Sequence, residues 1–431
     1  MSARKKILGM ALALALVGCG QLGTPTASVP AIGGPSELNA QSLASGIGLD
    51  KLPVIHIPAH PTVPVAPMRS GNSAQVFVSP VQTLPAIKAL INGAQKSVYI
   101  EIFALKDDSY GQQIVPLLID KARAGVEVRL NLDFIGSRIQ GGFGQMVDSL
   151  KKAGVIVHVY NPRIVRRVDG SYWFNITHRK EYIADGERAL VGGVNMNAPF
   201  DTTTEDILTL WQGPVLDDLM REFDHDWTES GGKLSELHQT AVDATAGTTD
   251  GEVLVTSPAQ GRFEGRDAVI REIGAAQHEI LIQQQYIWDT QLVQALIDAL
   301  HRGVQLRIMV PNPEQVSMLR DINTDTIEKL VKAGAQARWY RGVTPTAHLH
   351  TKYFSIDDRW AIDGSMNGDP MSTMDNQELD MATTDTSLIT SWHQQLFERD
   401  WAEQSEPFVY HAGSPILRPF RNLLDMLGYY L

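Results

Sequence analysis

The sequence has a single cysteine and no excess of positive charge, and each of these shortages argues against a kind of binding site. One of the 431 residues is a cysteine, Cys19, so the chain can form no internal disulfide and no metal site built from several thiolates. The 37 lysines and arginines are outnumbered by 49 acidic residues, which gives a net charge of −12. Because nucleic-acid binding relies on cationic groups that neutralise phosphates, this balance argues against broad nucleic-acid binding.

The solitary cysteine lies at the end of a secretory signal. Three basic residues at 4–6 precede an apolar run of about ten residues, which is too short to span a bilayer stably. The sequence Leu-Val-Gly-Cys that ends at Cys19 resembles a bacterial lipoprotein cleavage box, which implies cleavage before Cys19 and acylation of its thiol. We therefore expect an exported protein, lipid-anchored to the extracytoplasmic face of the cell envelope. An ordinary signal peptide with an incidental cysteine is the alternative.

Removal of the signal would change the charge. Residues 1–18 contain three basic and no acidic side chains, so the mature chain would carry 34 basic residues against 49 acidic ones, a net charge of −15. The expected mature protein is therefore more acidic than the whole sequence.

The body of the chain is a duplication. The segment 76–80, Val-Phe-Val-Ser-Pro, is echoed at 253–258, and the pattern Phe-x-x-Asp-Trp ends at both Trp227 and Trp401. Matched pairs are 172 to 182 residues apart, too long a period for a solenoid. Within each half, apolar strands alternate with helical stretches of about 12–16 residues, which predicts an α/β fold with two similar lobes around a parallel or mixed sheet.

Composition sets the expected domain boundaries. Residues 19–75 are rich in proline and predict an extended tether. The first lobe is expected at 76–232, a linker rich in Ser, Gly, Thr and Ala at 233–250, the second lobe at 251–405 and a tail at 406–431.

The same chemistry-bearing pattern occurs once in each half. Both copies read H-x-K-x-x-x-x-D and are followed, after the same interval, by G-[GS]-x-N. The matching residues are His178, Lys180, Asp185, Gly193 and Asn195 in the first half, and His350, Lys352, Asp357, Ser365 and Asn367 in the second. One copy would be a weak signal, but two copies at equivalent points of a duplication are a strong one.

Strand geometry gives this spacing a reason. Residues i and i+2 of a strand point to the same face, so His178 and Lys180 project together, as do His350 and Lys352. The aspartate of each motif is followed by residues typical of a tight turn, which returns the chain as a second strand and brings the Gly-x-x-Asn segment nearby. A glycine there lets a substrate group approach the backbone, and the asparagine amide can donate to an anion.

An imidazole, a fixed positive charge and a neutral donor in each half suit a phosphodiester. Lysine holds the non-bridging oxygens as negative charge builds up at phosphorus. Imidazole acts as a nucleophile or as a proton donor because its pKa lies near neutrality. A double displacement needs both roles on opposite sides of phosphorus, and one histidine from each half would supply them.

These residues resemble the paired HKD motifs of the phospholipase D superfamily, over residues 76–405, and the layout is most similar to its bacterial cardiolipin synthase and phospholipase D-like branch. The resemblance implies a duplicated two-lobe α/β sandwich with one active site at the interface of the lobes. It also implies a phospholipid substrate, a phosphohistidine intermediate resolved by water or by an alcohol, and no metal or other cofactor.

The resemblance also implies residue roles. His178 would be the nucleophile and His350 the general acid, an assignment that could be reversed. The expected phosphate-binding and substrate-binding residues are Lys180, Lys352, Asn195, Asn367, Gly193 and Ser365. Asp185 and Asp357 would orient or balance the charges of the site, although an aspartate at a turn is also common for local reasons.

Two carboxylates, a further histidine and a polar strand end are further candidates for the site. Glu378 lies where the family often places a carboxylate that holds a catalytic histidine, and Asp206 is its candidate counterpart; exposed carboxylates without a role are the alternative for both. His348 would share the strand face of His350, as a satisfied or supporting histidine rather than a metal ligand. Residues 283–286, Gln-Gln-Gln-Tyr, end a strand and could line the pocket.

Two other functions remain open at this point. Members of the superfamily also cleave DNA, so an extracytoplasmic nuclease or another phosphodiesterase is one alternative, against which the charge of −15 weighs. A non-catalytic lipoprotein that binds phosphate groups or lipid is the other, against which the intact histidine and lysine of both copies weigh.

Overall fold

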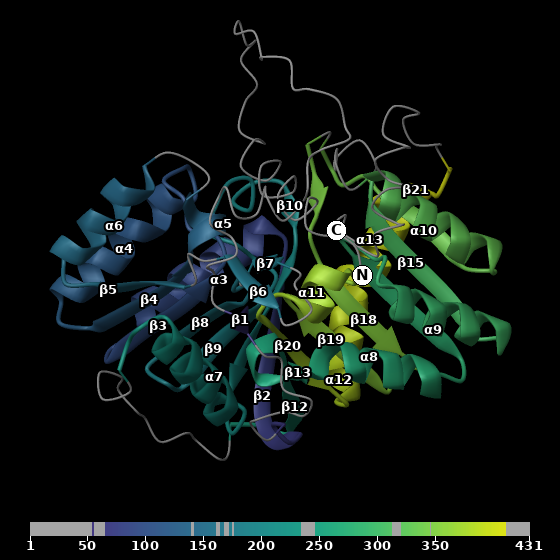
Figure 1. Ribbon diagram of the computed structural model, residues 1–431, viewed down its shortest axis with the longest axis horizontal. Coiled ribbons are helices and arrows are strands. Elements are labelled where there is room, and N and C mark those ends of the chain that lie inside the picture. Colours follow the sequence, from purple (N-terminus) through teal and green to yellow (C-terminus); the bar gives the residue numbers. More distant parts are fainter. Residues whose placement is uncertain are drawn as a thin grey trace, which may run out of the picture.

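The computed structural model describes residues 54–55, 65–138, 142–160, 164–167, 172–174, 176–233, 246–312, 320–344 and 346–410. They form two similar α/β lobes side by side, one purple to teal and the other green to yellow (Figure 1). The expected two-lobe α/β architecture is confirmed. The expected signal, Cys19 and the tail after residue 410 lie outside the described residues.

The first lobe comprises β2 (Arg69–Val78), α3 (Pro80–Gly93), β3 (Ser97–Ile102), α4 (Gly111–Arg123), β4 (Glu127–Asp133), α5 (Phe134–Arg138), α6 (Phe143–Lys152), β5 (Ile156–Tyr160), β8 (Lys180–Ala184), β9 (Arg188–Gly192), β10 (Thr204–Glu205), β11 (Ile207–Gln212) and α7 (Leu216–Glu229). A small separate sheet holds β1 (Val54–Ile55), β6 (Ile164–Arg167) and β7 (Tyr172–Phe174).

The second lobe comprises β12 (Thr249–Ser257), β13 (Arg262–Phe263), α8 (Glu264–Ala275), β14 (Glu279–Gln284), α9 (Thr290–His301), β15 (Gln305–Pro311), α10 (Arg320–Lys332), β16 (Gln336–Tyr340), β17 (His348–Leu349), β18 (Lys352–Ile356), β19 (Trp360–Gly364), α11 (Pro370–Met374), β20 (Glu378–Thr383), α12 (Thr386–Trp392), α13 (Glu398–Glu403) and β21 (Ser405–Pro407). A π-helical turn, His393–Phe397, joins α12 to α13.

One continuous mixed sheet crosses both lobes. Its order from the centre outward is β2-β11-β9-β8-β3-β4-β5 in the first lobe and β12-β20-β19-β18-β14-β15-β16-β21 in the second, and β2 pairs with β12 at the junction. The trios β3-β4-β5 and β14-β15-β16 are parallel, whereas the strands nearer the centre and the edge strand β21 pair antiparallel with their neighbours. The two orders are the same apart from β21, so β8 and β18, which carry the two motifs, are equivalent strands.

Both faces of the sheet are covered, so its strands are buried at successive positions, with some charged residues such as Glu101 and Glu181 among the apolar ones. In β3, Val98, Ile100 and Ile102 pack among α3, α4 and α6, while Tyr99 points to the opposite face and stacks on Phe223 of α7. A strand that is covered on both sides needs apolar residues at successive positions rather than in alternation.

The core on the second face is shared by the lobes. It unites Trp211, Phe223 and Trp227 of the first lobe with Trp392 and Phe397 of the second, all fully buried. The indole Nε1 of Trp392 also donates to Thr209 Oγ1 across the junction, at 3.1 Å. Because both lobes bury these side chains together, their relative position is held by a common core.

Two strands lie inside the segment 19–75 that was expected to be a tether. Strand β1 pairs with β6 in the small sheet, and β2, the first strand of the large sheet, begins at Arg69, where residues 69–73 pair with β11 and β12. Among the described residues, no helix is both long enough and apolar enough to cross a membrane.

Candidate active site

Each motif histidine lies just before its strand, at a point where the backbone contacts the other lobe. His178 and His350 precede β8 and β18, and each backbone N–H donates to a carbonyl of the opposite lobe: His178 to Gln377 at 2.8 Å, and His350 to Glu205 at 2.9 Å. These acceptors immediately precede Glu378 and Asp206 in the chain. The crossing therefore brings each lobe's histidine to the other lobe's carboxylate.

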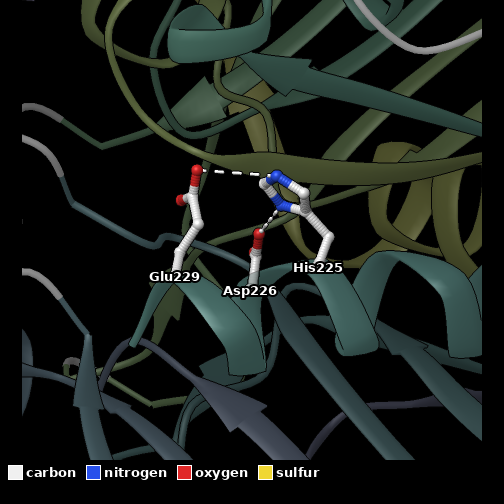
Figure 2. A group of neighbouring side chains, drawn as sticks. All are labelled: His225, Asp226 and Glu229. Atoms are coloured by element: carbon white, nitrogen blue, oxygen red, sulfur yellow. Dashed lines mark hydrogen bonds and ion pairs between the residues drawn. The ribbon is translucent and has the colours of Figure 1, made fainter. Parts of the chain in front are cut away.

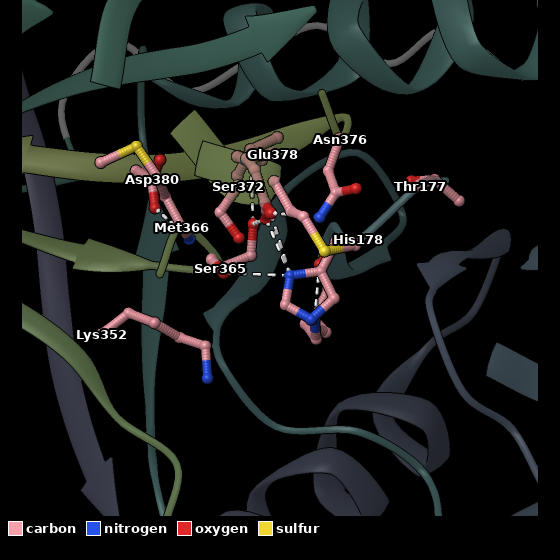
Figure 3. A network of polar contacts seen from close by, with 12 residues as sticks. Thr177, His178, Lys352, Ser365, Met366, Ser372, Asn376, Glu378 and Asp380 are labelled. Atoms are coloured by element: carbon pink, nitrogen blue, oxygen red, sulfur yellow. Dashed lines mark hydrogen bonds and ion pairs between the residues drawn. The ribbon is translucent and has the colours of Figure 1, made fainter. Parts of the chain in front are cut away.

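The side chains complete two crossed pairs. Nδ1 of His178 lies 2.9 Å from Oε2 of Glu378, and Nδ1 of His350 lies 2.7 Å from Oδ2 of Asp206 (Figure 3 shows the first pair). Both carboxylates are buried. These contacts agree with the expectation that Glu378 and Asp206 each hold a motif histidine. They also show that each carboxylate contacts the histidine of the other lobe.

The two carboxylates differ in their electrostatics. Burial alone would raise the pKa of Glu378, but His178, Lys180 and the Ser365 hydroxyl outweigh it, so its pKa is lowered. Asn376 Nδ2 also donates to this carboxylate at 3.2 Å. Burial raises the pKa of Asp206 to about 7, against the opposing effect of Lys352. At neutral pH, Glu378 is thus the firmly ionised member.

Both imidazoles are neutral near pH 7. Burial lowers the pKa of His178 to about 4, although Glu378 acts in the opposite direction. Burial and the nearby Lys352 also lower the pKa of His350. A neutral imidazole whose Nδ1–H donates to a carboxylate carries a free lone pair on Nε2, the form that a nucleophile requires.

The lysines flank these rings and are themselves buried. Nζ of Lys352 lies 2.8 and 3.2 Å from the two ring nitrogens of His350, and burial lowers its pKa to about 8. Nζ of Lys180 donates to the His178 carbonyl and lies 5.4 Å from the ring centre of Phe103; burial lowers its pKa too. Two desolvated cations beside neutral imidazoles form a site that favours an anion.

Two expected substrate-binding residues support the carboxylates instead. The Ser365 hydroxyl donates to Glu378, and its carbonyl lies 3.1 Å from Nδ1 of His178. At Gly193, a Cβ would come within 2.3 Å of Oδ1 of Asp206, so the glycine makes room for that side chain. The contacts that the structure shows for these two residues are with the carboxylates and His178, and the expectation that they bind substrate stays a prediction.

The paired asparagines lie at equivalent places and differ in their bonding. Oδ1 of Asn195 accepts a hydrogen bond from the Ala104 backbone at 3.3 Å. Oδ1 of Asn367 is buried and has no hydrogen-bond partner among the residues described. The structure leaves the expected phosphate contacts of both amides as predictions.

The aspartates of the two motifs lie at the turns that follow β8 and β18, away from the histidines. Asp185 accepts backbone N–H bonds from Gln95, Lys96 and Ser97, at 2.6 to 3.0 Å. Asp357 receives the equivalent bonds from residues 277–279, at 2.8 Å. Their φ angles are 59° and 53°, in the left-handed region that aspartate tolerates at turns. These contacts favour the local structural role that was the alternative for both aspartates, and their expected role in the charges of the site stays a prediction.

Replacing Asp185 by Ala should destabilise the fold and spare the chemistry. Three N–H groups lose their acceptor, which should lower the free energy of unfolding by about 1–3 kcal/mol in urea denaturation. Burial opposes ionisation of Asp185, but the three donors outweigh it and lower its pKa. Its contribution to stability is therefore present at neutral pH and is lost as the pH falls through this lowered value.

Glu187→Ala is the matched control in the same turn. Glu187 makes a half-exposed ion pair with Lys96, so its removal should cost less than about 1 kcal/mol. Equal destabilisation by both variants, or a loss of turnover per folded molecule in Asp185→Ala, would contradict the structural role.

Phe103 and Phe200 of the first lobe escaped the sequence analysis. Their rings pack edge-on against His178 and His350, with centroids 5.1 and 4.9 Å apart. Neither belongs to the repeated motif, and the equivalent positions of the second lobe are Gln285 and Ser372. A search for repeated residues cannot find contacts that one lobe makes alone.

One group of possible metal ligands occurs among the described residues, on α7. His225, Asp226 and Glu229 lie together, with His225 Nδ1 at 2.8 Å from Asp226 Oδ1 (Figure 2). The buried guanidinium of Arg179 lies 3.1 Å from Asp226, and the Tyr160 hydroxyl donates to Glu229. These partners balance the carboxylates, so the group is a structural ion-pair network and contributes nothing to the histidine site.

The fold and the site define a class of enzyme. Two equivalent lobes each contribute a histidine and a buried lysine to one centre, the arrangement expected of the phospholipase D superfamily. The chain belongs to the family described as "Cardiolipin synthase, PLD-like domain", whose profile matches residues 87–227 and 269–401. It is therefore an enzyme of the phospholipase D and cardiolipin synthase-like type.

Individual relatives agree with this membership. The chain is 28% identical to cardiolipin synthase B of Shigella flexneri, over 74% of this chain and 78% of that one. It is 27% identical to cardiolipin synthase A of Pseudomonas entomophila, over 78% and 70%. A solved structure, phosphatidylserine synthase of Haemophilus influenzae, shares the fold with a TM-score of 0.65 at 14% identity, covering 84% of this chain and 94% of that one.

Breaking either crossed pair should abolish most turnover. Glu378→Gln and Asp206→Asn should each lower kcat on a chromogenic phosphodiester by about 10²–10⁴-fold, because the histidine loses the acceptor that fixes its tautomer. Glu229→Gln, on the α7 network, is the control and should retain activity. A loss smaller than tenfold in both site variants would contradict the role given to the pairs.

Proposed function

We propose that the enzyme transfers phosphatidyl groups of phospholipids through a covalent phosphohistidine, to an alcohol as in cardiolipin synthesis or to water to give phosphatidic acid. The observation that carries the proposal is the pair of neutral imidazoles, each with its Nδ1 held by a carboxylate and each beside a buried lysine. The relatives named cardiolipin synthase support the phospholipid as substrate.

The reaction runs in two displacements. In the first, Nε2 of His178 attacks phosphorus, the bond from phosphorus to the alcohol oxygen breaks, and His350 donates a proton to that oxygen. In the second, an acceptor hydroxyl attacks phosphorus, His350 takes its proton, and the phosphorus–nitrogen bond breaks to regenerate His178. Each histidine ends as it began, so the cycle needs no other co-reactant.

The difference between the carboxylates supports this assignment of roles. The ionised Glu378 stabilises the positive charge that develops on His178 as its Nε2 bonds to phosphorus. His350 lies in contact with Lys352, so its pKa rises when an anionic phosphodiester offsets the charge of that lysine. Substrate binding thus lets His350 take up a proton from solvent, and this is the proton that His350 then donates to the leaving oxygen.

We further propose that the enzyme works at a membrane surface, held by lipid on Cys19 after export. The basic start, short apolar run and cysteine of residues 1–19 support this location. An anchored enzyme meets phospholipid at high effective concentration, so it needs no basic surface to find its substrate. The mature charge of −15 is consistent with a lipid substrate rather than a nucleic acid.

Product analysis tests the proposal. The full chain in detergent, incubated with phosphatidylglycerol vesicles and EDTA, should form cardiolipin or phosphatidic acid, and added deuterated glycerol should yield deuterated phosphatidylglycerol. His178→Ala and His350→Ala should each abolish product formation, whereas His393→Ala, a histidine remote from the site, should not. Full activity in either of the first two variants, or cleavage of DNA with no lipid product, would refute the proposal.

A further inference from the structure

The two halves of the site differ at two equivalent positions. Phe103 and Gln285 each follow the last residue of an equivalent strand, β3 or β14, and each contacts its own lobe's lysine. Ile176 and His348 each lie two residues before a catalytic histidine. The first half-site is thus lined by an apolar pair, and the second by two side chains that form hydrogen bonds.

The second pair forms a chain of polar contacts. Nζ of Lys352 donates to Oε1 of Gln285 at 3.4 Å, and Nε2 of Gln285 lies 3.1 Å from Nε2 of His348. Gln285 is buried, and its backbone N–H donates to Thr351 at 3.0 Å, within the second motif. The amide therefore has little freedom, and its contacts set the hydrogen-bonding direction of its neighbour.

The direction of this chain determines which nitrogen of His348 carries the proton. Because Oε1 of Gln285 accepts from Lys352, its amide nitrogen must donate to Nε2 of His348. Burial lowers the pKa of His348 to about 4, so the ring is neutral and its proton resides on Nδ1. Among the described residues, that Nδ1–H makes no hydrogen bond.

The pair lies at the general acid rather than at the nucleophile. The ring of His348 is 6.3 Å from that of His350, and Gln285 shares Lys352 with the same histidine. The Phe200 ring also packs edge-on against His350. An alcohol that leaves or enters at His350 therefore has both an apolar ring and hydrogen-bonding groups nearby.

We propose that Gln285 and His348 form a subsite that hydrogen-bonds a second hydroxyl of a polyhydroxylated alcohol, as that alcohol leaves or attacks beside His350. The inference rests on the proposed transferase function and names its acceptor class. The Nδ1–H of the half-buried His348 would donate to a second hydroxyl, so an alcohol that carries no second hydroxyl forms one hydrogen bond fewer at this place. The alcohol selected is thus of the glycerol type.

Competition between two alcohols tests the subsite. The full chain in detergent receives phosphatidylglycerol vesicles with equal concentrations of deuterated glycerol and 1-propanol, and mass spectrometry gives the ratio of the two transfer products. The unaltered enzyme should favour glycerol. Gln285→Leu and His348→Leu should each lower the glycerol-to-propanol ratio about three- to tenfold, the value of one or two hydrogen bonds, with transfer to propanol maintained.

Two further variants sharpen the test. His348→Asn, which keeps a donor, should retain more of the preference than His348→Leu, and His393→Asn, a half-buried histidine outside the site, should leave the ratio unchanged. An unchanged ratio in both leucine variants would overturn the inference. An equal fall in transfer to glycerol and to 1-propanol would also overturn it, since Gln285 and His348 would then only hold Lys352 in place. If the unaltered enzyme formed phosphatidic acid but transferred to neither alcohol, the inference would be overturned, whereas formation of no lipid product at all would refute the proposed function itself.

Discussion

The crossed contact between each histidine and the other lobe's carboxylate is the constraint on which the site depends. Neither lobe alone holds a complete half-site, since His178 needs Glu378 and His350 needs Asp206. The backbone makes the exchange first, through the bonds from the two histidine N–H groups to the residues before those carboxylates. The pairing of β2 with β12 and the shared tryptophan core then keep the lobes in register. The duplicated fold thus gives each histidine a carboxylate partner from the other lobe.

Burial turns this geometry into reactivity. It removes water from two lysines and two imidazoles, so the lysine and histidine pKa values fall even though Glu378 and Asp206 lie nearby. In the proposed mechanism, a phosphodiester would bring negative charge beside these lysines and so favour protonation of His350 as the general acid. The same desolvation keeps the ring of His178 neutral, as its proposed role as nucleophile requires.

Repetition in the sequence predicted whatever the two halves share. The duplication indicated the two lobes, and the i, i+2 spacing correctly placed each lysine beside its histidine. The exchange of carboxylates was out of reach, because it depends on tertiary pairing between segments about 200 residues apart. Gly193 and Ser365 were assigned to substrate because a glycine-rich turn suggests close approach, whereas the approaching group is a carboxylate from the next strand. Asp185 shares the motif pattern but supports a turn. The contrast between Phe103 and Gln285 lies where the halves diverge, so repetition could not reveal it.

The crossed pairing can be observed directly by ¹⁵N NMR of the full chain labelled at histidine. At pH 7 the ring nitrogens of His178 and His350 should both show the Nδ1–H tautomer. Glu378→Gln should perturb the signals of His178 and leave those of His350 largely unchanged, and Asp206→Asn should do the reverse. Perturbation of the histidine of the same lobe in each variant, or an Nε2–H tautomer at His178 in the unaltered protein, would contradict the account.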